Sequence, residues 1–151
     1  MEDFSRGLER IDWDPRLRIG FPMIDAQHEE LFRRAGALVV AMQGQGGREE
    51  AARLFPYLES YIVEHFSAEE GLMAARGYPG TADHVAEHRW FVRAFAVLMA
   101  EVEKTGPAAA AIGKTAALIE GWLKAHIAKT DLALGIFLTC DVPPRGVPRL
   151  I

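Results

Sequence analysis

The chain has 151 residues, of which 50% are hydrophobic and 25% are charged, and its formal net charge at pH 7 is −4. This composition is ordinary for one soluble globular domain, and the length is sufficient to bury a hydrophobic core. Because the chain is acidic and has neither a basic stripe nor a long apolar run, we expect no binding to nucleic acid, no binding to an anionic membrane surface and no membrane span.

The predicted elements are an N-terminal arm, four helices and a short tail. Residues 1–22 form the arm, with scattered apolar residues and a proline at its end. Helices are expected over about 24–42, 48–76, 81–104 and from 107 past 131, with Gly77 as a C-terminal cap and Pro107 in a first turn. Pro56 lies inside the second helix and predicts either a kink or a later start.

The fold predicted from these elements is all-α. No strand pattern occurs in the sequence, and the helices are long and joined by short connections. We therefore expect an antiparallel up-down four-helix bundle over residues 23–138. Residues 139–151 contain three prolines and a glycine, and they are expected to form an irregular tail.

Apolar residues recur at steps of three and four along each predicted helix, which is typical of helices that pack at a shallow angle. The expected seam of the second helix comprises Leu54, Leu58, Tyr61, His65 and Leu72. The expected seam of the third helix comprises His84, His88, Phe91, Phe95, Leu98 and Val102. All five histidines of the chain fall on such seams: His28, His65, His84, His88 and His126.

Five histidines in one core point to metal binding. A single histidine on an apolar face is most often a hydrogen-bonded core residue, but five would each need partners. Leaving a buried polar group without a partner costs about 1–3 kcal/mol, and a metal ion removes this cost by taking the lone pairs. Glu69 follows His65 by four residues, and His88 follows His84 by four, so each pair projects from one face of its helix.

Asp131 is the second candidate carboxylate ligand, and its spacing from His126 is unusual. The two residues are five positions apart, which places them about 140° apart around an ideal α-helix. They can share a face only if the helix holds one additional residue locally, as in a π-bulge. The alternative is that Asp131 caps the helix or faces solvent. Asp25 is expected to cap the first helix, and Glu70 is expected to face solvent.

Four segments of the chain together resemble the hemerythrin family, of the bacterial single-domain type, and the resemblance covers about residues 11–138. The segments are IDAQHEEL (24–31), HFSAEEGLM (65–73), YPGTADHVAEH (78–88) and WLKAHIAKTD (122–131). The resemblance implies a four-helix bundle that holds a non-haem centre of two iron ions and binds O2 reversibly.

The resemblance also implies roles for individual residues. One iron would be held by His84, His88 and His126, and the other by His28 and His65. Glu69 and Asp131 would bridge both ions. Two further residues match positions that shape the apolar oxygen pocket of the family, Trp122 and Leu123. The arm with Trp13 resembles the N-terminal segment that covers the bundle.

The expected function is O2 storage, delivery or buffering rather than catalysis. Carboxylate-rich di-iron enzymes use repeated Glu-x-x-His motifs, whereas this pattern is rich in histidine and leaves no spare histidine as a general acid or base. Two alternatives stay open: a module that senses O2 or redox state, for which the chain has no length for an output domain, and an enzyme that acts on peroxide or nitric oxide. The expected partners are O2 and an unidentified protein that receives the oxygen or the signal.

The expected location is the cytoplasm. The N-terminus is charged and lacks the apolar segment of a secretory signal. The single cysteine, Cys140, cannot form an intrachain disulfide, and we expect an inert thiol. Neither Cys140 nor the tail has a predicted role.

Overall fold

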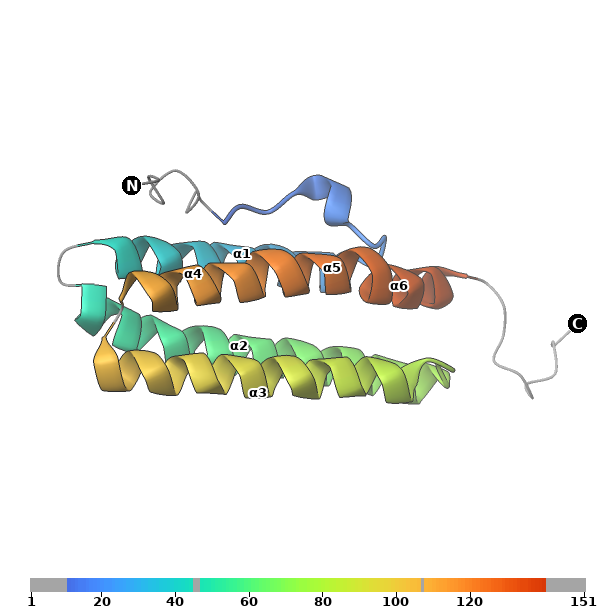
Figure 1. Cartoon of the computed structure of the whole chain (residues 1–151). Coiled ribbons are helices and arrows are strands. Elements are labelled where there is room, and N and C mark those ends of the chain that lie inside the picture. Colours follow the sequence, from blue (N-terminus) through green and yellow to red (C-terminus); the bar gives the residue numbers. More distant parts are fainter. Residues whose placement is uncertain (1–10, 45–46, 107, 141–151) are drawn as a thin grey trace, which may run out of the picture.

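Four long helical rods lie side by side in the structure, a computed structural model that describes residues 11–44, 47–106 and 108–140 (Figure 1). Three rods are single helices: α1 (Pro22–Gln43), α2 (Gly47–Arg76) and α3 (Thr81–Thr105). The fourth rod consists of consecutive helical segments: α4 (Ala109–Ala117), η3 (Leu118–Leu123), α5 (Lys124–His126), η4 (Ile127–Asp131) and α6 (Leu132–Thr139).

Successive rods run in opposite directions, as the colour gradient of Figure 1 shows. The residues that the structure describes contain no strand, so the predicted all-α, antiparallel up-down bundle is confirmed. Gly77 ends α2 in the left-handed conformation, with φ of 63°, and the amide of Tyr78 donates to the carbonyl of Met73. This is the predicted glycine cap. Pro107 and residues 141–151 of the predicted tail lie outside the described residues.

The core follows the predicted helical period most closely in α1 and α3. The buried positions of α3 are His84, His88, Phe91, Phe95, Leu98 and Val102, the predicted seam. Burying each large apolar side chain contributes about 1.5–3 kcal/mol, so this face holds α3 against its neighbours. Within the described ranges, no helix is both long and apolar enough to span a membrane.

The buried face of α2 differs from the predicted seam. Leu58 and His65 of that seam are buried, but Leu54, Tyr61 and Leu72 are only partly buried. The other buried positions of α2 are Ala51, Phe55, Ile62, Phe66, Glu69 and Met73. A strict seven-residue repeat drifts by about 20° per heptad on a straight helix, and α2 spans 30 residues. Pro56 lies inside this helix on its exposed side, so the alternative of a later start is wrong.

The arm covers α1 and the fourth rod before the chain enters the bundle (Figure 1). It contains a short helix, η2 (Pro15–Leu17), and it buries Ile11 and Ile19. The Asp25 carboxylate accepts hydrogen bonds from the arm amides of Ile19 at 2.7 Å and Gly20 at 3.2 Å. The prediction that Asp25 caps α1 is therefore wrong, since α1 begins before it and the carboxylate ties down the arm.

Two glycines let the arm lie against the helices. A Cβ atom on Gly36 of α1 would stand 2.7 Å from the carbonyl oxygen of Ile11, and one on Gly135 of α6 would stand 2.5 Å from that of Ile19. Both distances are shorter than a carbon and a carbonyl oxygen tolerate, and both obstacles are backbone atoms. The arm therefore packs closely only because these helix positions have no side chain.

We expect Gly135→Ala to displace the arm and to lower the free energy of unfolding by roughly 1–3 kcal/mol, as overpacking does elsewhere. Gly71→Ala is the matched control, because a Cβ on Gly71 meets nothing within 4 Å. This control should stabilise the protein by about 0.5–1 kcal/mol, since alanine favours a helix interior. Urea denaturation of both variants measures the two changes in the free energy of unfolding. An equal increase in both variants would show that the arm does not pack against Gly135.

Candidate metal centre

The seven predicted metal ligands lie together in one buried layer of the bundle. His28 comes from α1, His65 and Glu69 come from α2, and His84 and His88 come from α3, while the fourth rod supplies His126 and Asp131. None of these side chains is more than 3% exposed. Every rod therefore contributes at least one polar group to a layer whose surroundings are apolar.

The fourth rod brings His126 and Asp131 onto one face by winding as a π-helix over η4. A π-helix closes hydrogen bonds between residues five apart, so positions five apart come to lie one above the other. The Nε2 atom of His126 lies 3.1 Å from an oxygen of Asp131. The predicted insertion of one additional residue into the local helical turn is confirmed, and the alternatives in which Asp131 caps the helix or faces solvent are wrong.

The ligand atoms divide into two groups that share both carboxylates. One group contains Glu69, His84, His88, His126 and Asp131, and the other contains His28, His65, Glu69 and Asp131. Within each group the ligand atoms lie within 4.8 Å of one another. The groups therefore differ in having three histidines or two.

Each carboxylate turns one oxygen toward each group. Oε1 of Glu69 lies 3.0 Å from His65 and 3.4 Å from His28, while its Oε2 lies 3.1 Å from His88 and 3.2 Å from His84. Oδ2 of Asp131 lies 3.0 Å from His28, while its Oδ1 lies 3.0 Å from His84 and 3.1 Å from His126. This arrangement suits two carboxylates that bridge a pair of metal ions.

The donor atoms of this layer are better suited to coordinate metal ions than to form hydrogen bonds with one another. The Nε2 atoms of His28, His65, His88 and His126 are buried without a well-formed hydrogen bond, as are Oε1 of Glu69 and both oxygens of Asp131. Each such group costs about 1–3 kcal/mol when nothing satisfies it. Imidazole nitrogens and carboxylate oxygens are ligands for iron and other transition metals, so a metal pair would satisfy all of these atoms at once.

Proximity shifts the pKa values of the groups in this layer. Burial alone would raise the pKa of Glu69, but its histidine neighbours hold it well below the usual range. Burial would also lower the pKa of His28 and of His84, yet the negative carboxylates of Asp131 and Glu69 close beside them raise both to about 9. The carboxylates are therefore ionised at neutral pH, and an entering metal ion must displace the protons of His28 and His84.

Three polar residues that the sequence analysis missed hold the outer nitrogens of the ligands. Nδ1–H of His65 donates to the Gln27 amide oxygen at 2.7 Å, that of His88 donates to Glu70 at 3.0 Å, and that of His126 donates to Glu87 at 2.6 Å. Such bonds leave Nε2 free to face a metal and increase the basicity of the imidazole. The expectation that Glu70 only faces solvent is wrong.

The three supporting residues follow one rule. Each stands directly beside a ligand in sequence but holds a ligand on the next rod: Gln27 beside His28, Glu70 beside Glu69, and Glu87 beside His88. One position along a helix turns the side chain by about 100°, away from the metal layer and toward the neighbouring rod. A polar residue adjacent to a ligand was therefore the signal in the sequence.

Aromatic rings enclose the layer. The Phe66 ring stacks on His88 at a centroid distance of 3.8 Å, and the Trp122 ring stacks on His126 at 4.7 Å. Trp13 from the arm lies 6.2 Å from His28, so the arm covers the group with two histidines. Leu123 is buried at 2% exposure. Trp122 therefore contacts a predicted ligand, and Leu123 is a buried residue of the same rod. The role of these two residues in an oxygen pocket stays a prediction.

A four-helix bundle that gathers histidines and two shared carboxylates in its core belongs to the class of bundle proteins with a metal site between facing helices. The family profile described as the hemerythrin HHE cation binding domain matches residues 20–135 of this chain. The chain therefore belongs to the hemerythrin family.

Individual relatives agree with this membership. The chain is 32% identical to the bacteriohemerythrin of Methylococcus capsulatus over 118 residues, which are 78% of this chain and 86% of that protein. It is 29% identical to the myohemerythrin of Riftia pachyptila over 79% of this chain and 86% of that protein. The match to the bacteriohemerythrin of Stenotrophomonas maltophilia is 33% identical but spans 54% of this chain and only 52% of that protein.

Proposed function

We propose that this protein binds O2 reversibly at a non-haem centre of two iron ions, and that it stores, delivers or buffers oxygen. The observation that carries the proposal is the pair of shared carboxylates, Glu69 and Asp131, each with one oxygen toward each group of histidines. Membership of the hemerythrin family supports iron as the metal and O2 as the ligand.

In this proposal the two ions have different surroundings. His84, His88 and His126 would hold one iron, His28 and His65 would hold the other, and both carboxylates would bridge them. The second ion then has one protein ligand fewer, so the position for a small ligand falls on its side. When bound, the iron pair supplies the electrons and the open coordination position that O2 requires.

The chain itself positions the ions and keeps water away. Gln27, Glu70 and Glu87 fix the orientation of three imidazoles, so the inner nitrogens face the layer without reorganisation. The arm places Trp13 beside His28, on the side of the group with two histidines. An apolar enclosure there favours a neutral ligand such as O2 over water and anions, and Leu123 is proposed to form part of it with Trp122.

We further propose that the protein is not an enzyme. All five histidines of the chain belong to the two ligand groups, so none is left to act as a general acid or base. The proposed partners are O2 and a protein that receives the oxygen. The cytoplasmic location expected from the sequence stays a prediction.

The decisive test combines metal analysis with an optical spectrum. Protein produced in iron-rich medium should contain about two equivalents of iron per chain, because two complete ligand groups are present. Air should add a visible absorption band to the reduced protein, and vacuum should remove it. A single zinc ion after iron loading would contradict the iron pair, and rapid irreversible bleaching in air would favour an enzyme or a sensor.

A further inference from the structure

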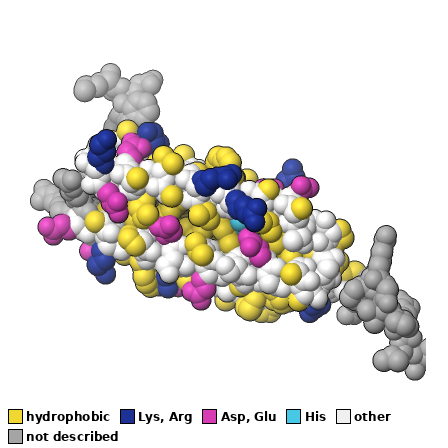
Figure 2. Space-filling view, turned by 90° about the horizontal axis from the view of Figure 1, so that it is seen from below, with side chains coloured by type: hydrophobic (Ala, Val, Ile, Leu, Met, Phe, Trp, Pro, Cys, Tyr) yellow, Lys and Arg dark blue, Asp and Glu magenta, His cyan; other side chains and the backbone are white. Residues whose placement is uncertain are grey.

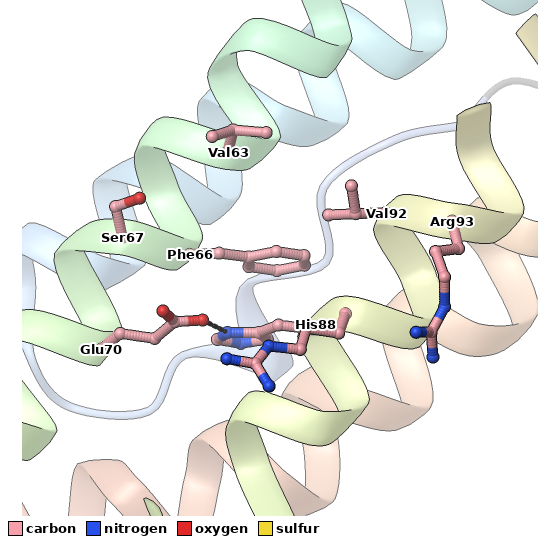
Figure 3. Close-up of a pocket in the computed structure, with 8 residues that line it drawn as sticks. Val63, Phe66, Ser67, Glu70, His88, Val92 and Arg93 are labelled. Atoms are coloured by element: carbon pink, nitrogen blue, oxygen red, sulfur yellow. Dashed lines mark hydrogen bonds and ion pairs between the residues drawn. The ribbon is translucent and has the colours of Figure 1, made fainter.

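A groove with a volume of about 330 Å³ opens between α2 and α3, next to the metal layer. Val63, Phe66, Ser67 and Glu70 line it from α2, and His88, Arg89, Val92 and Arg93 line it from α3 (Figure 3). Figure 2 shows the face of the molecule formed by α2 and α3, where a histidine is visible between basic and acidic side chains. His88 is the one predicted metal ligand that lines this groove, although its side chain is buried.

We propose that this groove binds a small organic anion with a flat apolar body, and that its occupancy is coupled to the metal centre through Glu70 and His88. The volume lies at the lower end of the range of roughly 300–1,000 Å³ that small-molecule sites occupy. It therefore suits a ligand of one or two rings rather than a peptide.

Two arginines supply the charge that selects an anion. Arg89 and Arg93 are one helical turn apart on α3, and both are exposed. Two other exposed arginines of the bundle are engaged, Arg33 by Glu30 and Arg53 by Glu50. Within the described part of the chain, no hydrogen bond or ion pair is found for Arg89 or Arg93. A guanidinium group binds a carboxylate through two parallel hydrogen bonds, so each of these arginines is suited to bind an anionic head group at this groove.

The remaining lining of the groove is suited to an apolar body. Val63 is 45% exposed although it is an aliphatic residue, and Val92 is partly buried beside it in the groove. The ring of Phe66 lies between α2 and α3, parallel to the His88 imidazole at an interplanar angle of 4° (Figure 3). A flat ring that covers Val63 and Val92 would remove apolar surface from water, which favours binding.

The groove and the metal layer are coupled because they share Glu70 and His88. This step rests on the proposed function. Glu70 lines the groove and accepts the hydrogen bond from Nδ1 of His88 at 3.0 Å, and that bond tunes the imidazole that would hold iron. An anion on Arg89 and Arg93 adds negative charge beside this bond. Because coupling is reciprocal, an anion that changes the relative stability of the two oxidation states of the iron binds with a different affinity to each of them.

Calorimetric titration of the purified protein with naphthalene-2-carboxylate tests the site. We expect one binding site with a sub-millimolar Kd. The double variant Arg89→Gln/Arg93→Gln should bind this probe about tenfold more weakly or worse, since charge-assisted bonds to the head group are lost. Naphthalene-2-methanol, which has the same ring system without the charge, should bind weakly and should not distinguish the variant from the parent.

Two controls separate the groove from general charge effects. Arg76→Gln removes an exposed arginine at the end of α2, outside the groove, and should leave the Kd unchanged. Val63→Asp should abolish binding, whereas Val40→Asp, on an exposed face of α1, should not. Absence of binding, equal affinity for the neutral analogue, or a Kd unaffected by the loss of both arginines would overturn the proposed site.

The coupling is tested on the iron-loaded ferric protein. Its visible absorption should change as the probe is added, with half-saturation at the calorimetric Kd. A change that persists in the double arginine variant would mean that the anion reaches the iron itself, and an unchanged spectrum at full occupancy would also overturn the coupling. A protein that holds no iron would contradict the proposed function while leaving the calorimetric result for the groove intact.

Discussion

Glu69→Ala is expected to remove nearly all iron from the protein. The two oxygens of Glu69 face different groups of histidines, so the substitution takes one ligand from each proposed iron site. It also leaves a cavity beside four buried imidazoles, those of His28, His65, His84 and His88, which lose a partner that keeps them oriented. Iron content should fall from about two equivalents per chain to a small fraction of one, because the free energy of metal binding depends on a complete ligand set.

Single histidine variants should separate the two sites. His65→Ala removes one of only two histidines in its group, so it should lower O2 binding first and leave part of the iron in place. His88→Ala belongs to the group of three and should reduce iron there. Glu64→Ala is the control, because Glu64 is exposed on α2, close to His65 in sequence. Metal analysis and oxygen titration check this order, and full iron content in Glu69→Ala would show that the carboxylate does not bridge.

Much of the ligand layer could be predicted because its members obey helical spacing. His65 and Glu69, and likewise His84 and His88, lie four residues apart, and a regular helix must place such pairs on one face. The pair of His126 and Asp131 breaks this spacing, and that departure itself indicated the π-helical winding of η4. A buried polar pair at the wrong spacing is therefore informative, since only a local change in winding reconciles it with the core.

The spacing of residues in the sequence could not by itself predict the hydrogen bonds that hold the ligand histidines. Glu70 and Glu87 hold histidines on the next helix, and such a contact depends on how far each helix is rotated about its axis. Seven-residue seams fix that rotation only loosely, as the shifted buried face of α2 shows. The role of Asp25 was hidden for a related reason. Its partners are backbone amides of the arm, whose path has no repeating pattern in sequence.

Leu123→Ala is expected to speed the decay of the oxygenated protein to the ferric form. Leu123 is buried and lies three residues before His126, so the two side chains share the inner face of the fourth rod. Truncation should cost roughly 2–5 kcal/mol of stability if the cavity does not collapse. The cavity should also admit water and small anions to the irons. Leu123→Asn should have the larger effect on decay, since it adds a polar group to the same place.

The control for this prediction is a cavity of the same size at a distance from the irons. Leu38 is fully buried in α1, ten residues beyond His28, which corresponds to about 15 Å along the helix. Leu38→Ala should lose comparable stability but should keep the decay rate of the parent, measured from the visible spectrum in air at equal iron content. If both Leu123 variants keep that rate with the centre intact, Leu123 serves only as core packing. The enclosure of the open iron position would then have to come from other residues, and Trp13 of the arm would be the next to test because it lies beside His28.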